Sequence, residues 1–196
     1  ILIKGGSELE SARQLKAIAL DKTGTLTTGS PQLVDWQSWK GAASDEAAAR
    51  AYALASRSDH PVSRAIAQGL QEKVGQNFAE AQQLQALPGR GVQAQVNGEG
   101  WTLANLRWVG EQGWDSAELK ATLRLQEQQG RTVTLLANSL GVQALFAVAD
   151  PLRPQAKEAV QQLLTLGVKP VVLSGDNTAT VRTVAAEAGI TDARGN

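Results

Sequence analysis

The sequence lacks cysteine and methionine, contains one histidine, and carries no net charge. Without cysteine the chain has no disulfide and no thiolate metal site, which is consistent with a cytosolic setting. Because 19 Lys and Arg residues balance 19 Asp and Glu residues, composition favours neither nucleic acid nor an anionic membrane surface as a partner. No apolar run approaches the ~20 residues that span a bilayer, and no signal-peptide pattern is present.

The length and apolar content are those of a folded protein. The chain has 196 residues, of which 42% are hydrophobic, enough for one large or two small domains. A complete gene product starts with Met, whereas this chain starts with Ile1. We therefore expect an excised piece of a longer protein.

Two kinds of pattern divide the chain. Near both ends, short apolar strands alternate with helices, at residues 17–20, 155–166, 168–173 and 178–188, while residues 1–7 suit a strand or an entry segment. The middle is typical of antiparallel strands and helices. We therefore predict an α/β fold in which a parallel-sheet domain, residues 1–30 and 150–196, is interrupted by an α+β domain on an antiparallel sheet, residues 31–149.

The most informative segment is Asp-Lys-Thr-Gly-Thr-Leu-Thr, residues 21–27, which follows the apolar strand at 17–20. A strand that ends in a carboxylate and continues into a turn rich in Gly and Thr is suited to hold a phosphate, because the turn supplies backbone N–H groups and hydroxyls. Asp21 is placed to attack phosphorus or to bind a metal ion. The competing interpretation is a plain strand-to-turn junction with capping threonines.

A second turn with the same pattern of a small hydroxyl residue, a glycine and an acid follows the strand at 168–173, at Ser174, Gly175 and Asp176. The carboxyl ends of parallel strands meet at one edge of a sheet, where ligands bind in this architecture. Ser174 is then placed to donate to a phosphate oxygen, and Asp176 to orient Lys22 or a water molecule. By itself such a segment also forms an ordinary turn.

Together these segments resemble the phosphorylation and Thr-Gly-Asp motifs of P-type ATPases, the ion pumps that form an aspartyl-phosphate, with Ser174 where Thr is usual. Ser58-Asp59-His60-Pro61 is similar to the His-Pro motif of the branch that transports heavy metals. The resemblance covers the whole chain, and it implies a haloacid-dehalogenase-like phosphorylation domain with an inserted nucleotide-binding domain.

The resemblance also implies a set of nucleotide-binding residues. His60 would hold the adenine, with Asp59 and Pro61 beside it, and the turn at Gly89 and Gly91 would let the backbone approach the nucleotide. Asp150 and Arg153 match a hinge motif that helps to hold nucleotide between the two domains. Without the resemblance, a lone His at a helix start is more often a cap, a Gly-x-Gly is more often a plain turn, and Asp150 and Arg153 suit a solvated helix entrance.

The cofactors implied are ATP and Mg²⁺. The γ-phosphate would pass in line to Asp21, with Lys22 and Ser174 on the phosphate oxygens, and Mg²⁺ would be held incompletely by Asp21 and Thr23. The family's later Gly-Asp-Gly-x-Asn-Asp motif does not occur after Asp176. We therefore expect a C-terminally truncated phosphorylation domain that binds nucleotide without turnover.

Thr23 separates this interpretation from the nearest alternative, a soluble phosphatase of the haloacid dehalogenase group. Such phosphatases carry a second Asp two positions after the nucleophile, and Thr cannot act as a general base at neutral pH. A further alternative is a nucleotide-binding module without catalysis.

The predicted function is the cytosolic ATP-binding and phosphorylation part of a pump that exports Zn, Cd or Cu ions across a bacterial inner or plasma membrane. Its partners would be ATP and the membrane and actuator domains of the same parent chain. We expect neither nucleic acid nor the transported ion to bind this region.

Overall fold

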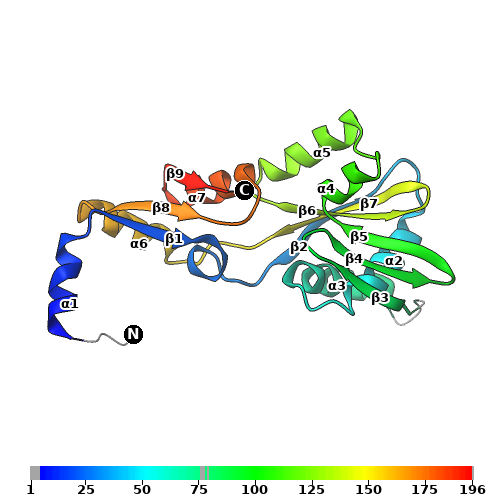
Figure 1. Cartoon of the computed structure of the whole chain (residues 1–196), viewed down its shortest axis with the longest axis horizontal. Helices are drawn as coiled ribbons and strands as arrows, with labels where there is room; N and C mark the ends of the chain where they lie inside the picture. The colour runs from blue at the N-terminus through cyan, green and yellow to red at the C-terminus, as the bar shows by residue number, and fades with distance from the viewer. Residues whose placement is uncertain (1–4, 76–77, 79, 196) are drawn as a thin grey trace. The chain divides into compact units, whose positions relative to one another are not determined.

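The computed structural model describes residues 5–75, 78 and 80–195, so most of the expected entry segment at residues 1–7 lies outside the described residues. The chain divides into two compact units, one of residues 1–29 and 152–196 and the other of residues 30–151. We call them the outer unit and the inner unit. As predicted, the fold is mixed α/β, with one parallel and one antiparallel sheet (Figure 1).

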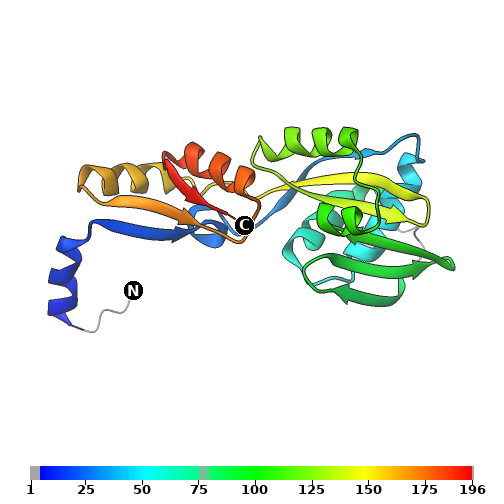
Figure 2. The same ribbon diagram turned by 45° about the horizontal axis from the view of Figure 1, so that its top comes forward.

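The outer unit is a three-stranded parallel sheet in the order β1-β8-β9. Figure 2 shows α6 and α7 on the same side of this sheet, where Val160, Val172 and Val181 meet in one buried cluster. Along the chain its elements are α1 (Gly6–Ser11), a 3₁₀ turn (Ala12–Gln14), β1 (Ala17–Asp21), a tight turn (Lys22–Leu26), α6 (Ala156–Thr165), β8 (Lys169–Leu173), α7 (Thr178–Ala188) and β9 (Asp192–Arg194).

The inner unit is a six-stranded antiparallel sheet in the order β2-β7-β6-β5-β4-β3. Its elements are β2 (Gln32–Ser38), α2 (Ser44–Ala55), α3 (Pro61–Val74), β3 (Gln82–Leu87), β4 (Gly91–Val96), β5 (Glu99–Ala104), α4 (Leu106–Glu111), α5 (Ala117–Glu127), β6 (Thr132–Asn138) and β7 (Gly141–Ala149). Helices cover both faces, since α2 and α3 pack into one buried cluster and α4 and α5 into another (Figure 2).

Local chemistry accounts for several of these boundaries. Pro61 occupies the first turn of α3, where its missing N–H costs nothing, and the His60 side chain caps that helix. The β4–β5 hairpin turns through Asn97 and Gly98, both at positive φ (54° and 79°), as a two-residue hairpin turn requires. The helix α7 ends at Gly189, which is also left-handed (φ 88°).

Candidate functional site

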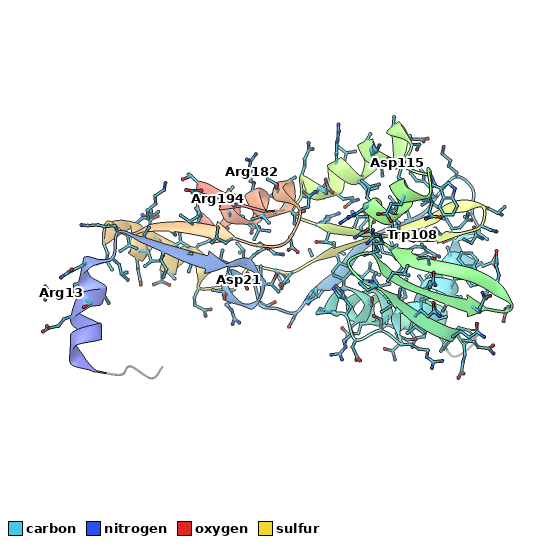
Figure 3. All side chains as sticks on the ribbon, in the orientation of Figure 1. Arg13, Asp21, Trp108, Asp115, Arg182 and Arg194 are labelled. Carbon is cyan, nitrogen blue, oxygen red and sulfur yellow. The ribbon has the colours of Figure 1, made fainter. Side chains whose placement is uncertain are left out.

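The end of β1 positions Asp21, the sequence-predicted nucleophile. Asp21 is the last residue of the strand and pairs in register with Leu173, the last residue of β8. The turns that follow both strands therefore begin at the same edge of the sheet. Figure 3 shows Asp21 at the carboxyl end of β1, and its side chain is exposed, so the sheet holds a carboxylate that a ligand can reach.

The turn after Asp21, residues 22–27, is fixed by one buried hydroxyl. Gly24 takes a left-handed conformation (φ 76°), which reverses the chain. The Oγ1 atom of Thr27 donates to the carbonyl of Lys22 at 3.0 Å and accepts the N–H of Gly24 at 3.1 Å. Thr27 is 0% exposed, so these bonds are shielded from water. Sequence reasoning assigned no role to Thr27, although its hydroxyl at the end of the motif was the available signal.

The second turn joins the first through an ion pair. The Lys22 ammonium is buried and pairs with the carboxylate of Asp176. The N–H of Asp176 donates to Oγ of Ser174 at 3.2 Å, and the N–H of Ser174 donates to the carbonyl of Arg194 at 3.1 Å. A hydroxyl that accepts a bond keeps its own proton to donate. Gly175 is exposed between these two residues.

The hinge motif places Asp150 and Arg153 in different units. The Arg153 guanidinium donates to the carbonyl of Gly24 at 2.8 Å, and the Arg153 backbone N–H donates to the carbonyl of Leu26 at 2.8 Å. In the inner unit, Asp150 accepts the N–H of Ser30 at 3.2 Å. Arg153 therefore supports the turn after Asp21 in this structure.

The oxygens of Asp21 and Thr23 are the kind of donor that Mg²⁺ prefers. Thr23, two positions after Asp21, is exposed. Across the described residues, no group of three or more His, Cys, Asp or Glu side chains is placed to hold a metal ion. The donor atoms of Asp21 and Thr23 therefore fit Mg²⁺ in kind.

A separate cavity of about 620 Å³ lies in the inner unit, within the usual size range of ligand pockets. It brings together Asp59 and His60 with Gly89 and Gly91, which are far apart in sequence. Pro61 does not line this cavity and lies exposed at the start of α3. The remaining walls include apolar side chains of β3, β4 and β5: Ala86, Leu87, Val92, Leu103 and Ala104.

His60 reaches the cavity with a defined tautomer. Its Nδ1 atom accepts the backbone N–H of Val62 at 3.3 Å. In a neutral imidazole whose Nδ1 accepts a bond, Nε2 carries the proton and donates. Asp59 is held by Arg64, with 2.7 Å between carboxylate and guanidinium.

Both glycines have a positive φ, and they differ in the space around them. Gly89 (φ 66°) has open space where a Cβ would lie. A Cβ on Gly91 (φ 149°) would meet the carbonyl oxygen of Leu103 at 2.1 Å, because β5 runs alongside with Ala104 opposite Gly91. Gly91 is therefore the position at which only glycine fits.

Arg90, between the two glycines, is a cavity residue that sequence reasoning missed. Its guanidinium makes two bonds to the carboxylate of Glu111, at 2.7 and 2.8 Å. These hydrogen bonds lower the pKa of Glu111 and raise the pKa of Arg90. A cation between the two glycines of the Gly-x-Gly segment was the signal in the sequence.

Comparisons with known proteins identify the family and the fold. The model of the haloacid dehalogenase-like hydrolase family matches residues 15–196. The chain is 34% identical over 192 residues to copper-exporting P-type ATPase B of Archaeoglobus fulgidus, covering 98% of this chain and 27% of that protein. It is 31% identical over 194 residues to the zinc-transporting ATPase of Bacillus subtilis, covering 97% of this chain and 30% of the relative. The chain thus spans less than a third of either relative.

Solved structures give the same result. A zinc-transporting PIB-type ATPase in its E2.Pi state matches with a TM-score of 0.70 and 34% identity, over 99% of this chain and 31% of that one. The catalytic domain of the CPx-ATPase CopB-B matches with a TM-score of 0.71 over 100% of this chain and 66% of that one, at 22% identity, which supports the fold alone. In the described part of this chain, no helix has the length and apolar character that crossing a membrane requires.

Proposed function

The chain belongs to the haloacid dehalogenase-like hydrolase family, and on that premise we propose that it is the phosphorylation and nucleotide-binding region of a heavy-metal-transporting P-type ATPase. Its relatives are P-type ATPases that export copper or transport zinc. In this proposal the outer unit is the phosphorylation domain and the inner unit is the nucleotide-binding domain.

One observation carries the proposal. The register of β1 and β8 places Asp21 at the same sheet edge as the Ser174–Asp176 turn, and Lys22 joins the two turns through its pair with Asp176. An exposed carboxylate beside a cationic, glycine-containing turn is suited to accept a phosphoryl group and to hold the resulting anion.

The roles of the individual residues follow from their contacts. Asp21 attacks the γ-phosphorus of ATP, forming the acyl-phosphate bond as the bond to the ADP oxygen breaks. Ser174 donates a hydrogen bond to a phosphate oxygen, while Lys22, through its ion pair with Asp176, holds the second turn to the first. Asp21 and Thr23 would hold Mg²⁺, which supplies charge neutralisation when it is bound.

Thr23 favours a pump over a phosphatase. It is exposed two positions after Asp21, where a general base would activate water against the acyl-phosphate. The pKa of a Thr hydroxyl is far too high for that role at neutral pH. The phosphoenzyme therefore survives long enough to drive a transport step.

The inner cavity provides the nucleotide site. His60 donates from Nε2 to the adenine, and the apolar walls of β3, β4 and β5 cover its ring faces. The backbone at Gly89 and Gly91 approaches the nucleotide. Asp59 lines the same cavity and pairs with Arg64 in an exposed contact.

The complete protein would couple ATP hydrolysis to export of Cu, Zn or Cd ions. The transported ion would bind in membrane segments, and the membrane and actuator domains would be the partners of this region. This region would lie on the cytosolic side of a bacterial inner or plasma membrane.

The proposal is tested by acid-stable labelling of the complete gene product with ATP labelled at the γ-phosphate. Asp21→Asn should abolish the label and leave ATP binding largely intact. The matched control is Asp192→Asn, because Asp192 begins β9 at the opposite edge of the same sheet. Label that persists in Asp21→Asn would place the nucleophile elsewhere, and rapid hydrolysis of phosphomonoesters without label would indicate a phosphatase.

A second measurement tests nucleotide binding in residues 1–196. Calorimetry should detect ATP, and His60→Ala should weaken both ATP and adenosine, because the imidazole contacts the base. Unchanged affinities in His60→Ala would show that the adenine lies elsewhere.

A further inference from the structure

Arg90 gives the inner cavity its positive charge. Of the described residues that line the cavity, it is the one with a permanently cationic side chain. The other ionic groups near it are the Asp59 carboxylate, which is paired with Arg64, and Glu111, which does not line the cavity and also contacts Arg107 at 3.5 Å. Arg90 therefore lines the cavity while its guanidinium pairs with a carboxylate of α4.

The contacts of Arg90 leave part of its donor set available. A guanidinium has five N–H donors. Within the described part of the chain, Nε and Nη2 each donate one bond to Glu111, and Nη1 donates one to the carbonyl of Pro88 at 3.3 Å. One N–H therefore remains on each of Nη1 and Nη2, and two such adjacent donors form the fork that binds a phosphate through two oxygens.

Glu111 fixes the direction of that fork. The double contact occupies one edge of the planar guanidinium, so the remaining donors are held by a rigid group. The backbone is fixed too, because the N–H of Arg90 donates to Leu87 at 2.9 Å and its carbonyl accepts from Asn105 at 2.8 Å. A cation that is ordered before the ligand arrives loses less entropy when the ligand binds.

We propose that Arg90 binds the phosphate chain of the nucleotide and so makes the inner cavity selective for nucleotides over nucleosides. Glu111 is a positioning residue that orients Arg90 without contacting the ligand. The inference rests on the proposed nucleotide site, and it adds a residue that sets the ligand class.

The competing explanation is structural: the Arg90–Glu111 pair would only hold the Gly89–Gly91 turn against α4. The two explanations predict different results for the two partners. If the pair has only this structural role, replacing either partner weakens ligand binding to the same degree. If Arg90 binds phosphate, its loss is specific to phosphate-bearing ligands, whereas Glu111→Gln removes a negative charge near the phosphate and keeps the cation.

The experiment is calorimetry of residues 1–196 with ATP and with adenosine, for the wild type, Arg90→Gln and Glu111→Gln. A hydrogen bond to a charged group is worth enough that Arg90→Gln should weaken ATP binding by about tenfold or more. Adenosine binding should stay unchanged in Arg90→Gln. Glu111→Gln should weaken ATP binding less than Arg90→Gln does, because it loosens the orientation of Arg90 but keeps the cation.

Four results would overturn the inference. If Arg90→Gln binds ATP as tightly as the wild type does, Arg90 does not contact phosphate. If Arg90→Gln weakens ATP and adenosine binding equally, or if Glu111→Gln weakens ATP binding as much as Arg90→Gln does, the pair has only a structural role. If the wild type binds neither ligand, the proposed nucleotide site fails and this inference fails with it, an outcome distinct from the other three.

Discussion

The half-buried ion pair between Lys22 and Asp176 should stabilise the outer unit, and its two partners should not be equivalent. The Lys22 side chain is 7% exposed, whereas that of Asp176 is 37% exposed. Asp176→Asn leaves a buried ammonium without its counter-charge. Lys22→Met leaves a carboxylate that water can reach. We therefore expect Asp176→Asn to destabilise more than Lys22→Met.

Two reference cases bracket the magnitude. Removing one partner of a fully buried pair costs about 3–5 kcal/mol, and a fully exposed pair contributes about 0.2–1 kcal/mol. Because only one partner is buried here, we expect Asp176→Asn to cost about 2 kcal/mol, which corresponds to roughly 30-fold faster exchange through local opening. The double variant should recover much of this loss, because it removes the stranded charge.

The assay is hydrogen exchange of the β1 and β8 amides, followed by mass spectrometry, in a double-mutant cycle. Tryptophan fluorescence during urea unfolding supplies an internal control. All five tryptophans lie between residues 36 and 114, inside the inner unit. That transition should therefore not move in any of the three variants.

Strict additivity in the cycle would refute the reasoning, because it would mean that the two side chains do not interact in solution. A larger loss in Lys22→Met than in Asp176→Asn would also refute it. Such a result would mean that the aliphatic stem of Lys22 matters through packing, and that the buried charge does not control the stability of this edge.

Two further predictions concern the inner unit. Gly91→Ala should destabilise it by about 2 kcal/mol or more, because the new Cβ meets the Leu103 carbonyl at 2.1 Å. Gly89→Ala has open space for its Cβ and should cost only about 1 kcal/mol, for its positive φ. Equal shifts of the two variants in the fluorescence-detected urea midpoint would contradict this. Burial raises the pKa of Glu127 above its ordinary value of 4.5, and the Arg124 charge opposes the shift. The folded state therefore binds the carboxyl proton of Glu127 more tightly than the unfolded state does. As a result, the free energy of unfolding falls as pH rises from 4.5 through the raised pKa. Glu127→Gln should accordingly raise Tm at pH 7 and leave it unchanged at pH 3, in paired calorimetric scans, and a gain that persists at pH 3 would show that the charge is not the cause.

Local chemistry made most of the elements predictable. The apolar run before Asp21 became β1, and Pro61 began α3 as its fixed φ favours. Asn97-Gly98 formed the hairpin turn between β4 and β5. Each of these signals lies within a few residues of the feature that it determines, so the feature can be predicted from the sequence alone.

Two strands carry no periodic apolar signal of their own. The strand β3 begins at Gln82, with glutamine at three of its six positions. Its glutamines lie exposed at the sheet edge, where no core demands an apolar residue. The short strand β9 pairs Asp192 with Val171 and Ala193 with Val172, so its ladder to β8 forms it rather than any side-chain pattern of its own.

At the site, residue types were predictable and partners were not. That parallel strands share a carboxyl edge follows from topology, so Asp21 and the Ser174 turn belong to one edge. The bond from Arg153 to the carbonyl of Gly24, however, joins positions 129 residues apart. No local pattern encodes a contact to a backbone carbonyl, because every residue has one.

The hinge motif shows what this limit means for function. In the sequence, Asp150 and Arg153 belong to one motif that matches a nucleotide-binding element. In the structure they lie in different units. Asp150 accepts the N–H of Ser30 where the inner unit begins, and Arg153 in the outer unit binds the turn that follows Asp21. A guanidinium held on the Gly24 carbonyl places a positive charge on the turn that would receive a phosphoryl group. Arg153 can therefore support phosphorylation as a positioning residue without any contact to nucleotide.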